Sequence, residues 1–384
     1  MSVQQEEDVQ VPVPELLSAL LEREGSDLHL TAGAPPVIRV NGDLERLEEY
    51  PVLTPRALQG MIYAILPQKL RERFEQELEL DMSYSLPGKA RFRVNVYFQR
   101  DSVGAAFRLI PYEIKTIESL NLPGVVADLA RFQRGFVVVT GPTGSGKSTT
   151  LSSMVNVVNL ERAAHIMTVE DPIEFLHKHK RCIVNQREVG ADTHGFSQAL
   201  KHVLRQDPDV ILVGEMRDLE TIGTAITAAE TGHLVFATLH TQDAPQTIDR
   251  IIDVFPPHQQ QQVRVQLSTT LQGVVTQQLV PTHDGQGRVV ACEVMVATPA
   301  IRNLIREGKV HQIYSAMQAG GRYGMQTMDM ALAQHVKAGR ITQQVAFERC
   351  HDAEELNRLV GGAGAAGGYA GTVDAYGSPG GSYA

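Results

Sequence analysis

The spacing of apolar residues divides the chain into two regions. From about residue 12 to 112, short helix-like and strand-like patterns alternate. The segment PELLSALLEREGSDLHLTAGAPPVIRVNGDL predicts a helix and then two strands, which are interrupted by Pro35 and Pro36. These patterns predict a small α+β domain at the N-terminal end.

The segment RFRVNVYFQRDSVGAAFRLI follows and predicts two strands of a hairpin, the first of which alternates polar and apolar residues. Arg91, Arg93 and Asn95 fall on one face of the first strand. The opposite face carries the apolar residues Phe92, Val94 and Val96. The apolar face is expected to pack on the domain core.

From about residue 120 the pattern changes to strand, helix, strand, helix, which favours a parallel sheet with helices on both faces. PYEIKTIESLNLP is the expected linker before this region. The C-terminal segment is rich in Gly, Ala, Ser and Tyr and carries a single charge, Asp374, so we expect it to be disordered. The predicted parts are an N-terminal domain (1–112), a linker (113–119), a second domain (120–358) and the tail (359–384).

Composition narrows the function. A length of 384 residues favours two domains, and a hydrophobic content of 43% supports real cores. The net charge of −9, the few aromatic residues and the absence of Trp disfavour nucleic-acid binding. Three distant cysteines without a C-x-x-C pair indicate neither a zinc ribbon nor a disulfide framework. We see no signal peptide and no apolar run long enough to cross a bilayer, and therefore expect a cytoplasmic protein without direct membrane insertion.

The stretch VVVTGPTGSGKSTT contains the clearest chemical signal. It fits G-x-x-x-x-G-K-[ST], a glycine-rich turn between a buried strand and a helix, whose amides and lysine hold nucleoside triphosphate phosphates. A glycine-rich turn without a ligand is the alternative, and the flanking strand and helix disfavour it. The predicted nucleotide-binding residues are Gly141, Pro142, Thr143, Gly144, Ser145, Gly146, Lys147, Ser148 and Thr149.

Acidic residues follow two later strands. MTVEDPIEF places Glu170, Asp171 and Glu174 close together, where a cation would relieve their repulsion, although a solvated loop is the alternative. DPDVILVGEMRD contains an apolar strand followed by Gly214 and Glu215. The carboxyl ends of parallel strands meet at the ligand-binding edge, so Glu215 is the expected carboxylate on the metal side. Asp209 lies at the other end and is expected to be a turn residue.

The next block, TGHLVFATLHT, is a buried strand with His233 and His240 at its two ends. The spacing differs from that of a zinc-binding helix. His240 falls at the nucleotide edge and is a candidate sensor of the γ-phosphate, whereas hydrogen bonding to local carbonyl groups remains open for both histidines. HKHK, from His177 to Lys180, is expected to be a solvated loop.

These four blocks, GPTGSGKST, VEDPIEF, LRQDPDVILVGEMRD and TGHLVFATLHT, occur in one order. Together they closely resemble the secretion-ATPase superfamily, the hexameric motors of type II secretion and type IV pili. GSDLHLTAGAPPVIRVNGDL resembles the PAS-like N-terminal domain of the pilus-retraction members, and AIRNLIREGK is similar to a motif typical of them. The resemblance covers roughly residues 12 to 355. It implies a PAS-like domain followed by a RecA-like P-loop NTPase domain with a mainly parallel sheet.

The resemblance also implies roles for individual residues. Lys147 would bind phosphate, and Glu174 would be the general base. His233 and His240 would form a histidine box at the subunit interface. Arg93 and Arg108 would reach the phosphates when the domains close, with a plain surface charge as the alternative. The residues implied for Mg²⁺ are Ser148, Glu215 and Asp171.

AIRNLIREGK has a physical interpretation of its own. Ile301, Leu304 and Ile305 form one apolar helical face, Arg302, Arg306 and Lys309 lie on the other side, and Gly308 is a plausible helix stop. An ordinary amphipathic helix is the alternative to a mobile segment needed for retraction.

The function that the resemblance implies is a Mg²⁺-dependent ATPase that drives pilus retraction as a homohexamer. Its implied partners are a PilC-like platform protein at the inner face of the cytoplasmic membrane and a PilU-like ATPase. The alternatives are a pilus-extension or type II secretion ATPase, the accessory retraction ATPase itself, a DNA translocase, or a regulatory nucleotide-binding module.

Overall fold

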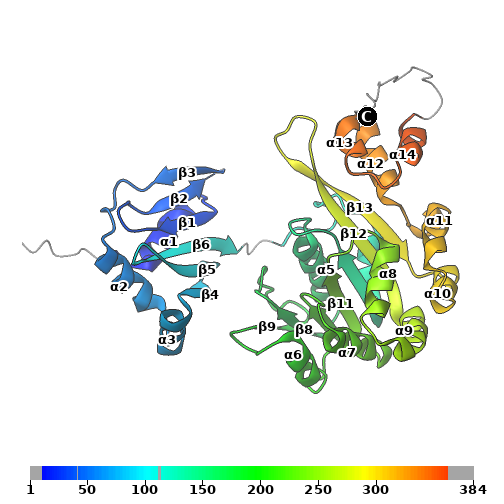
Figure 1. Cartoon of the computed structure of the whole chain (residues 1–384), viewed down its shortest axis with the longest axis horizontal. Coiled ribbons are helices and arrows are strands. Elements are labelled where there is room, and N and C mark those ends of the chain that lie inside the picture. Colours follow the sequence, from blue (N-terminus) through cyan, green and yellow to red (C-terminus); the bar gives the residue numbers. More distant parts are fainter. Residues whose placement is uncertain (1–10, 41, 111–113, 362–384) are drawn as a thin grey trace, which may run out of the picture.

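The computed structural model describes residues 11–40, 42–110 and 114–361. Two sheets organise them, one in each half of the chain (Figure 1). The first sheet has the strand order β3-β2-β1-β6-β5-β4, and its neighbouring strands are antiparallel. Its strands are β1 (Asp27–Leu30), β2 (Val37–Val40), β3 (Asp43–Arg46), β4 (Glu79–Leu86), β5 (Ala90–Gln99) and β6 (Ser102–Ile110).

Three helices accompany this sheet: α1 (Val13–Glu22), α2 (Pro55–Ile65) and α3 (Gln68–Glu77). One core joins them to the strands. Phe92, Val94 and Val96 of β5 are fully buried in it, as the alternating pattern predicted. Thr54 begins α2 by accepting a hydrogen bond from the Ala57 amide, and Pro55 takes the first helical position, where no amide hydrogen is needed.

The second sheet has the order β13-β12-β7-β11-β10-β8-β9 and is parallel except for the β12–β13 hairpin. The first parallel strands are β7 (Gly135–Thr140), β8 (His165–Glu170) and β9 (Ile183–Glu188). The remaining strands are β10 (Val210–Val213), β11 (Leu234–Leu239), β12 (Leu271–Pro281) and β13 (Arg288–Val296). β7, β10 and β11 are buried along their whole length, as expected for strands covered on both faces.

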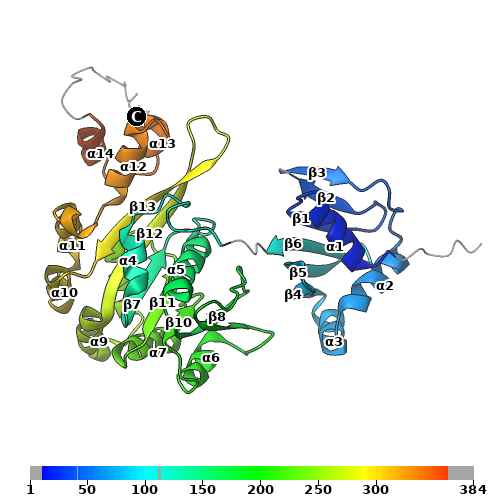
Figure 2. The ribbon, with the colours of Figure 1, turned by 180° about the vertical axis from the view of Figure 1, so that it is seen from behind.

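Helices cover both faces of this sheet, as seen from the two sides in Figures 1 and 2. Val137 and Val139 of β7 face a core shared with α4 (Val125–Arg131) and α5 (Lys147–Glu161). Phe136 and Val138 face the opposite core. The helices of that core are α6 (Phe196–Val203), α7 (Leu219–Glu230), α8 (Ala244–Asp253), α9 (Pro257–Thr270), α10 (Pro299–Arg306) and α11 (Ile313–Gln318).

The C-terminal helices form a smaller core against the β12–β13 hairpin. They are α12 (Met328–Lys337), α13 (Gln343–Phe347) and α14 (Ala353–Val360), and short 3₁₀ turns lie at Val310–Gln312 and Gly321–Tyr323. The predicted tail starts at residue 359, whereas α14 continues to Val360. The rest of the predicted tail, 362–384, lies outside the described residues.

The predicted fold class, an N-terminal α+β domain followed by a P-loop domain with a mainly parallel sheet, is confirmed. The hairpin of Arg91 to Ile110 and the buried strands of the second domain are found where the patterns placed them. The linker and the exact domain boundaries stay predictions.

Candidate nucleotide site

The P-loop joins β7 to α5, and its conformation requires glycine. Gly141, Gly144 and Gly146 all have positive φ, a region that residues with a Cβ rarely adopt. At Gly141 a Cβ would also lie 2.2 Å from the carbonyl oxygen of Gln277 on β12. The loop is therefore fixed against a neighbouring strand at the start of α5, where the backbone amides of a helix N-terminus can bind phosphate.

Two polar groups of the loop fit an anionic ligand. The Oγ of Ser145 is buried and has no hydrogen-bond partner among the described residues. The Nζ of Lys147 donates to the carbonyl oxygens of Gly141 at 2.8 Å and Pro142 at 3.0 Å. Burial lowers the pKa of Lys147, and the charges of Glu215 and Glu174 offset part of that effect. A phosphate group would satisfy both side chains.

A cavity of about 620 Å³ opens beside the loop and gathers residues from several elements. Of the sequence-predicted residues it is lined by Thr143, Gly144, Gly146, Lys147, Ser148, Thr149, Asp171, Glu174, Glu215, His240 and Arg93. Arg93 comes from β5 of the N-terminal domain, whereas the others belong to the P-loop domain. The cavity thus combines both domains around one set of phosphate-binding and acidic groups.

Glu215 lies at the carboxyl end of β10, where its carboxylate meets two basic side chains. Arg217 contacts both oxygens, with Nε 2.6 Å from Oε1 and Nη2 2.7 Å from Oε2. His240, just after β11, has its Nε2 3.1 Å from Oε1. The hydrogen bond from Arg217 lowers the pKa of Glu215, against the opposing effect of burial, and His240 adds to the lowering. Because β10 and β11 are neighbours, the strand order itself brings Glu215 and His240 together.

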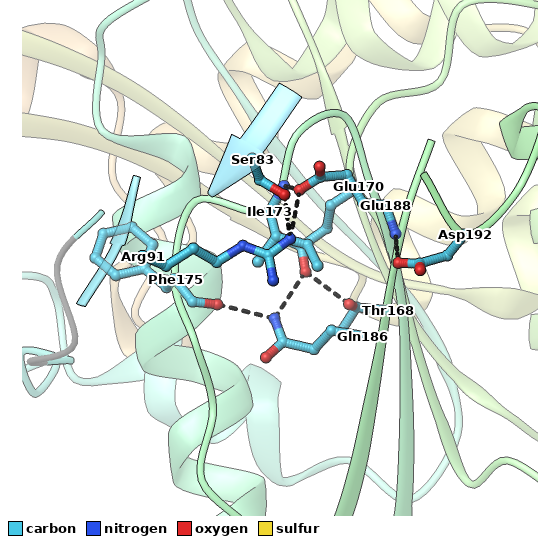
Figure 3. A network of polar contacts seen from close by, with 9 residues as sticks. All are labelled: Ser83, Arg91, Thr168, Glu170, Ile173, Phe175, Gln186, Glu188 and Asp192. Carbon is cyan, nitrogen blue, oxygen red and sulfur yellow. Dashed lines mark hydrogen bonds and ion pairs between the residues drawn. The ribbon is translucent and has the colours of Figure 1, made fainter. Parts of the chain in front are cut away.

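The loop from Asp171 to His177 carries Glu174 and is held by β9 (Figure 3). The amide of Gln186 donates to the Phe175 carbonyl at 2.8 Å and to the Glu170 carboxylate at 3.1 Å. Thr168 donates a further hydrogen bond to Glu170 at 2.6 Å. Burial nevertheless raises the pKa of Glu170 to about 6. These contacts fix Glu170 within the structure and leave Glu174 exposed at the cavity.

Outside the P-loop, two candidate site residues of the sequence do not line the cavity. His233, at the opposite end of β11, is not among the described residues that line the cavity; its Nδ1 is 2.9 Å from the Ala228 carbonyl. Arg108 is likewise outside that lining set and forms a 2.7 Å ion pair with Asp27. The structure therefore does not bring His233 or Arg108 to the nucleotide cavity of their own chain, and their roles stay predictions. Asp209 accepts from the His165 amide at 2.8 Å, consistent with a turn residue.

Sequence reasoning missed several cavity residues. Arg217 and Arg288 line the cavity, the second from the β12–β13 hairpin. His177, expected in a solvated loop, is half-buried in the cavity wall, and burial lowers its pKa to about 4. The position of Arg217, two residues after Glu215 at a strand end, was a usable signal. The positions of Arg288 and His177 at the cavity depend on contacts with distant parts of the chain, which no local pattern reveals.

Most of the AIRNLIREGK segment forms α10, whose buried residues Ile301 and Ile305 follow the predicted face. The helix ends at Arg306, and Gly308, with its positive φ, follows two residues later. Arg302 was expected on the polar side of the helix, but its guanidinium group is bound to α9. Its Nη1 donates to the carbonyls of Ser268 and Thr269 at 2.9 and 2.8 Å, at the C-terminal end of α9. A guanidinium group there satisfies carbonyl groups that have no partner within the helix.

The described part of the chain lacks two further features. No group of three or more His, Cys, Asp or Glu side chains is arranged to hold a metal ion. No helix is long and apolar enough to cross a membrane.

Comparison with known proteins decides the family. Residues 124–348 match the family described as "Type II/IV secretion system protein". The chain belongs to this family. The matched segment runs from α4 to beyond α13 and includes every residue of the P-loop.

Individual relatives of this secretion-system family cover almost the whole chain. The type IV pilus retraction ATPase PilT of Pseudomonas aeruginosa is 54% identical over 88% of this chain and 97% of its own length. The type IV pilus ATPase PilU of the same organism is 43% identical over 90% of both chains. A crystal structure of the pilus retraction motor PilT with bound ADP superposes with a TM-score of 0.85, at 50% identity, over 91% of this chain and 99% of that one. The chain is therefore a P-loop ATPase of this family that binds nucleotide.

Proposed function

We propose that this ATPase powers the retraction of a type IV pilus. The observation that carries the proposal is the single cavity that joins the P-loop, two acidic segments and Arg93 of the N-terminal domain. The similarity to a retraction ATPase over nearly the whole chain supports the cellular role.

The residues of the cavity divide the work of hydrolysis. Lys147 and the P-loop amides hold the phosphates, and Glu174 orients and deprotonates the attacking water. The hydroxyl of Ser148 with the carboxylates of Asp171 and Glu215 would hold Mg²⁺ together with phosphate oxygens and water, as this ion prefers. The ion would neutralise charge on the phosphate oxygens. A site of this kind needs few protein ligands, which fits the donors present.

Mechanical work follows because the N-terminal domain is attracted to the nucleotide site more strongly before hydrolysis than after it. The γ-phosphate draws Arg93, and in the predicted closed state Arg108, toward Lys147, so the two domains close around ATP. After hydrolysis and phosphate release this attraction is lost and the domains reopen. In a homohexamer at the inner face of the cytoplasmic membrane, such steps would pass to a PilC-like platform protein and withdraw pilin subunits from the fibre.

A substitution pair tests the catalytic part. Glu174→Gln should keep ADP and ATP affinity within about twofold and lower turnover by roughly 10²–10⁴-fold, the range for loss of a general base. Lys147→Ala should abolish nucleotide binding. Turnover that survives in Glu174→Gln would show that another group activates water.

The phenotype of a deletion strain tests direction. Excess immobile pili support retraction, and bald cells support the alternative of pilus extension or type II secretion. Because a PilU relative is also similar over most of the chain, partial loss of retraction would favour an accessory role. A strain carrying Lys147→Ala should match the deletion strain.

A further inference from the structure

An ion pair connects the two domains beside the loop that carries Glu174 (Figure 3). The Nη2 of Arg91 on β5 lies 3.2 Å from the Oε2 of Glu188, the last residue of β9. The two side chains are 19% and 5% exposed. Burial of this kind removes most of the solvent screening that weakens surface ion pairs.

The same carboxylate oxygen has a second donor. The backbone amide of Ile173 donates to the Oε2 of Glu188 at 3.0 Å. Ile173 directly precedes Glu174 and is 2% exposed. One oxygen therefore links a guanidinium group of the N-terminal domain to the backbone next to the proposed general base.

Both ends of this link are anchored. Arg91 donates from Nη2 to the Ser83 Oγ at 2.7 Å on the neighbouring strand β4. Glu188 donates from its own amide to the Asp192 carboxylate at 2.8 Å, which fixes the end of β9. A displacement of the N-terminal domain would thus move Arg91 as part of a sheet, while the backbone of Glu188 stays in place.

We propose that Arg91 is a positioning residue for hydrolysis, which acts through Glu188 to hold the Ile173 backbone and so to place Glu174. Docking of the N-terminal domain then has two effects on the site. Arg93 adds charge at the cavity, whereas Arg91 orders the loop of the general base. This inference rests on the proposed role of Glu174.

The physical reason is the cost of an unpaired buried carboxylate. With Arg91 present, the Glu188 carboxylate is neutralised where it accepts the Ile173 amide. Without Arg91, the free energy of the charged Glu188 carboxylate falls when the side chain rotates toward water. This rotation removes the acceptor from the Ile173 amide. The P-loop does not take part in this chain of contacts, so nucleotide affinity should be unaffected.

Steady-state ATPase assays and titration of a fluorescent ADP analogue on the full chain test the proposal. Arg91→Ala should lower kcat roughly ten- to a hundredfold, about 1.4–2.8 kcal/mol at 1.4 kcal/mol per tenfold change. KM and ADP affinity should stay within about twofold. Arg91→Lys should recover a large part of kcat because it restores the charge. Arg131→Ala is the matched control, since it removes an ion pair with Glu161 whose side chains are 48% and 45% exposed.

A double-mutant cycle separates action through Glu188 from independent effects. Glu188→Gln should lower kcat, and adding Arg91→Ala to it should cause little further loss. Additive losses overturn the proposal, as does a parallel loss of ADP binding or an unchanged kcat in Arg91→Ala. If Arg91→Ala does not fold, Arg91→Lys and Glu188→Gln still give the kcat and KM comparison.

Measuring Glu174→Gln in the same assays distinguishes the proposed base role of Glu174 from the proposed positioning role of Arg91. Loss of turnover in Glu174→Gln with full kcat in Arg91→Ala removes only the positioning role. Retained turnover in Glu174→Gln removes the base assignment on which the positioning role depends.

Discussion

Glu293 offers a quantitative test of the packing around the β12–β13 hairpin. This residue of β13 is 0% exposed, and its two oxygens accept hydrogen bonds from the amides of Ala244 at 2.8 Å and Met328 at 3.3 Å. These amides belong to the first residues of α8 and α12. Burial raises the pKa of Glu293 to about 7, and nearby acidic residues add to this effect while the two amides oppose it.

The sign of the pH effect follows from this shift. The folded protein holds the Glu293 proton more tightly than the unfolded chain, whose glutamates titrate near 4.5. The contribution of the protonated Glu293 to the stability of the folded protein is therefore complete below pH 4.5. It is lost as the pH rises through about 7. At 1.4 kcal/mol per tenfold change in proton affinity, the difference corresponds to roughly 3 kcal/mol.

Glu293→Gln removes this titration. We expect the wild-type melting temperature to fall relative to that of Glu293→Gln by roughly 6–12 °C between pH 4.5 and 8, taking about 2–4 °C per kcal/mol for a domain of this size. Far-UV circular dichroism is the method of choice for unfolding, because the chain has no Trp whose fluorescence could be followed. Glu348→Gln, at an exposed position directly after α13, is the control. Parallel pH curves for wild type and Glu293→Gln would refute the reasoning.

Three further substitutions test the site and the fold. Gly141→Ala would place a Cβ 2.2 Å from the Gln277 carbonyl at a positive φ, so both melting temperature and ADP affinity should fall; an unchanged ADP titration would contradict this. Arg217→Ala removes the cation that lowers the pKa of Glu215, so the acid limb of the kcat/KM profile should move to higher pH. Arg302→Ala leaves two carbonyls at the end of α9 without their donor and should cost about 1–3 kcal/mol in unfolding measurements, with normal stability as the opposing result.

Local patterns predicted much of this molecule. The P-loop is contiguous in sequence, and its glycines and lysine specify their geometry without help from distant residues. The alternation in β5 and the unbroken apolar strands β7, β10 and β11 likewise gave the correct elements. Glu215 lines the cavity because parallel strands end at one edge, as the sequence predicted, while its role toward a metal ion stays a prediction.

Residues whose partners lie far away in sequence were harder to interpret. Arg302 has the spacing of an exposed polar face, but the end of α9 packs there and accepts its hydrogen bonds. Glu293 is a single acid among apolar residues of a strand, and only the arrangement of α8 and α12 supplies its donors. Arg288 reaches the cavity because β12 pairs with β7, a register that no local pattern contains.

The pairing of β12 with β7 has a consequence for shortened forms of the protein. β7, which leads into the P-loop, is flanked by β11 on one side and β12 on the other. A fragment that ends at residue 270 would leave one side of β7 with unpaired backbone groups on a wholly apolar strand, which is a template for self-association. The nucleotide-binding half should therefore aggregate when it is expressed without the hairpin, although every P-loop residue is present.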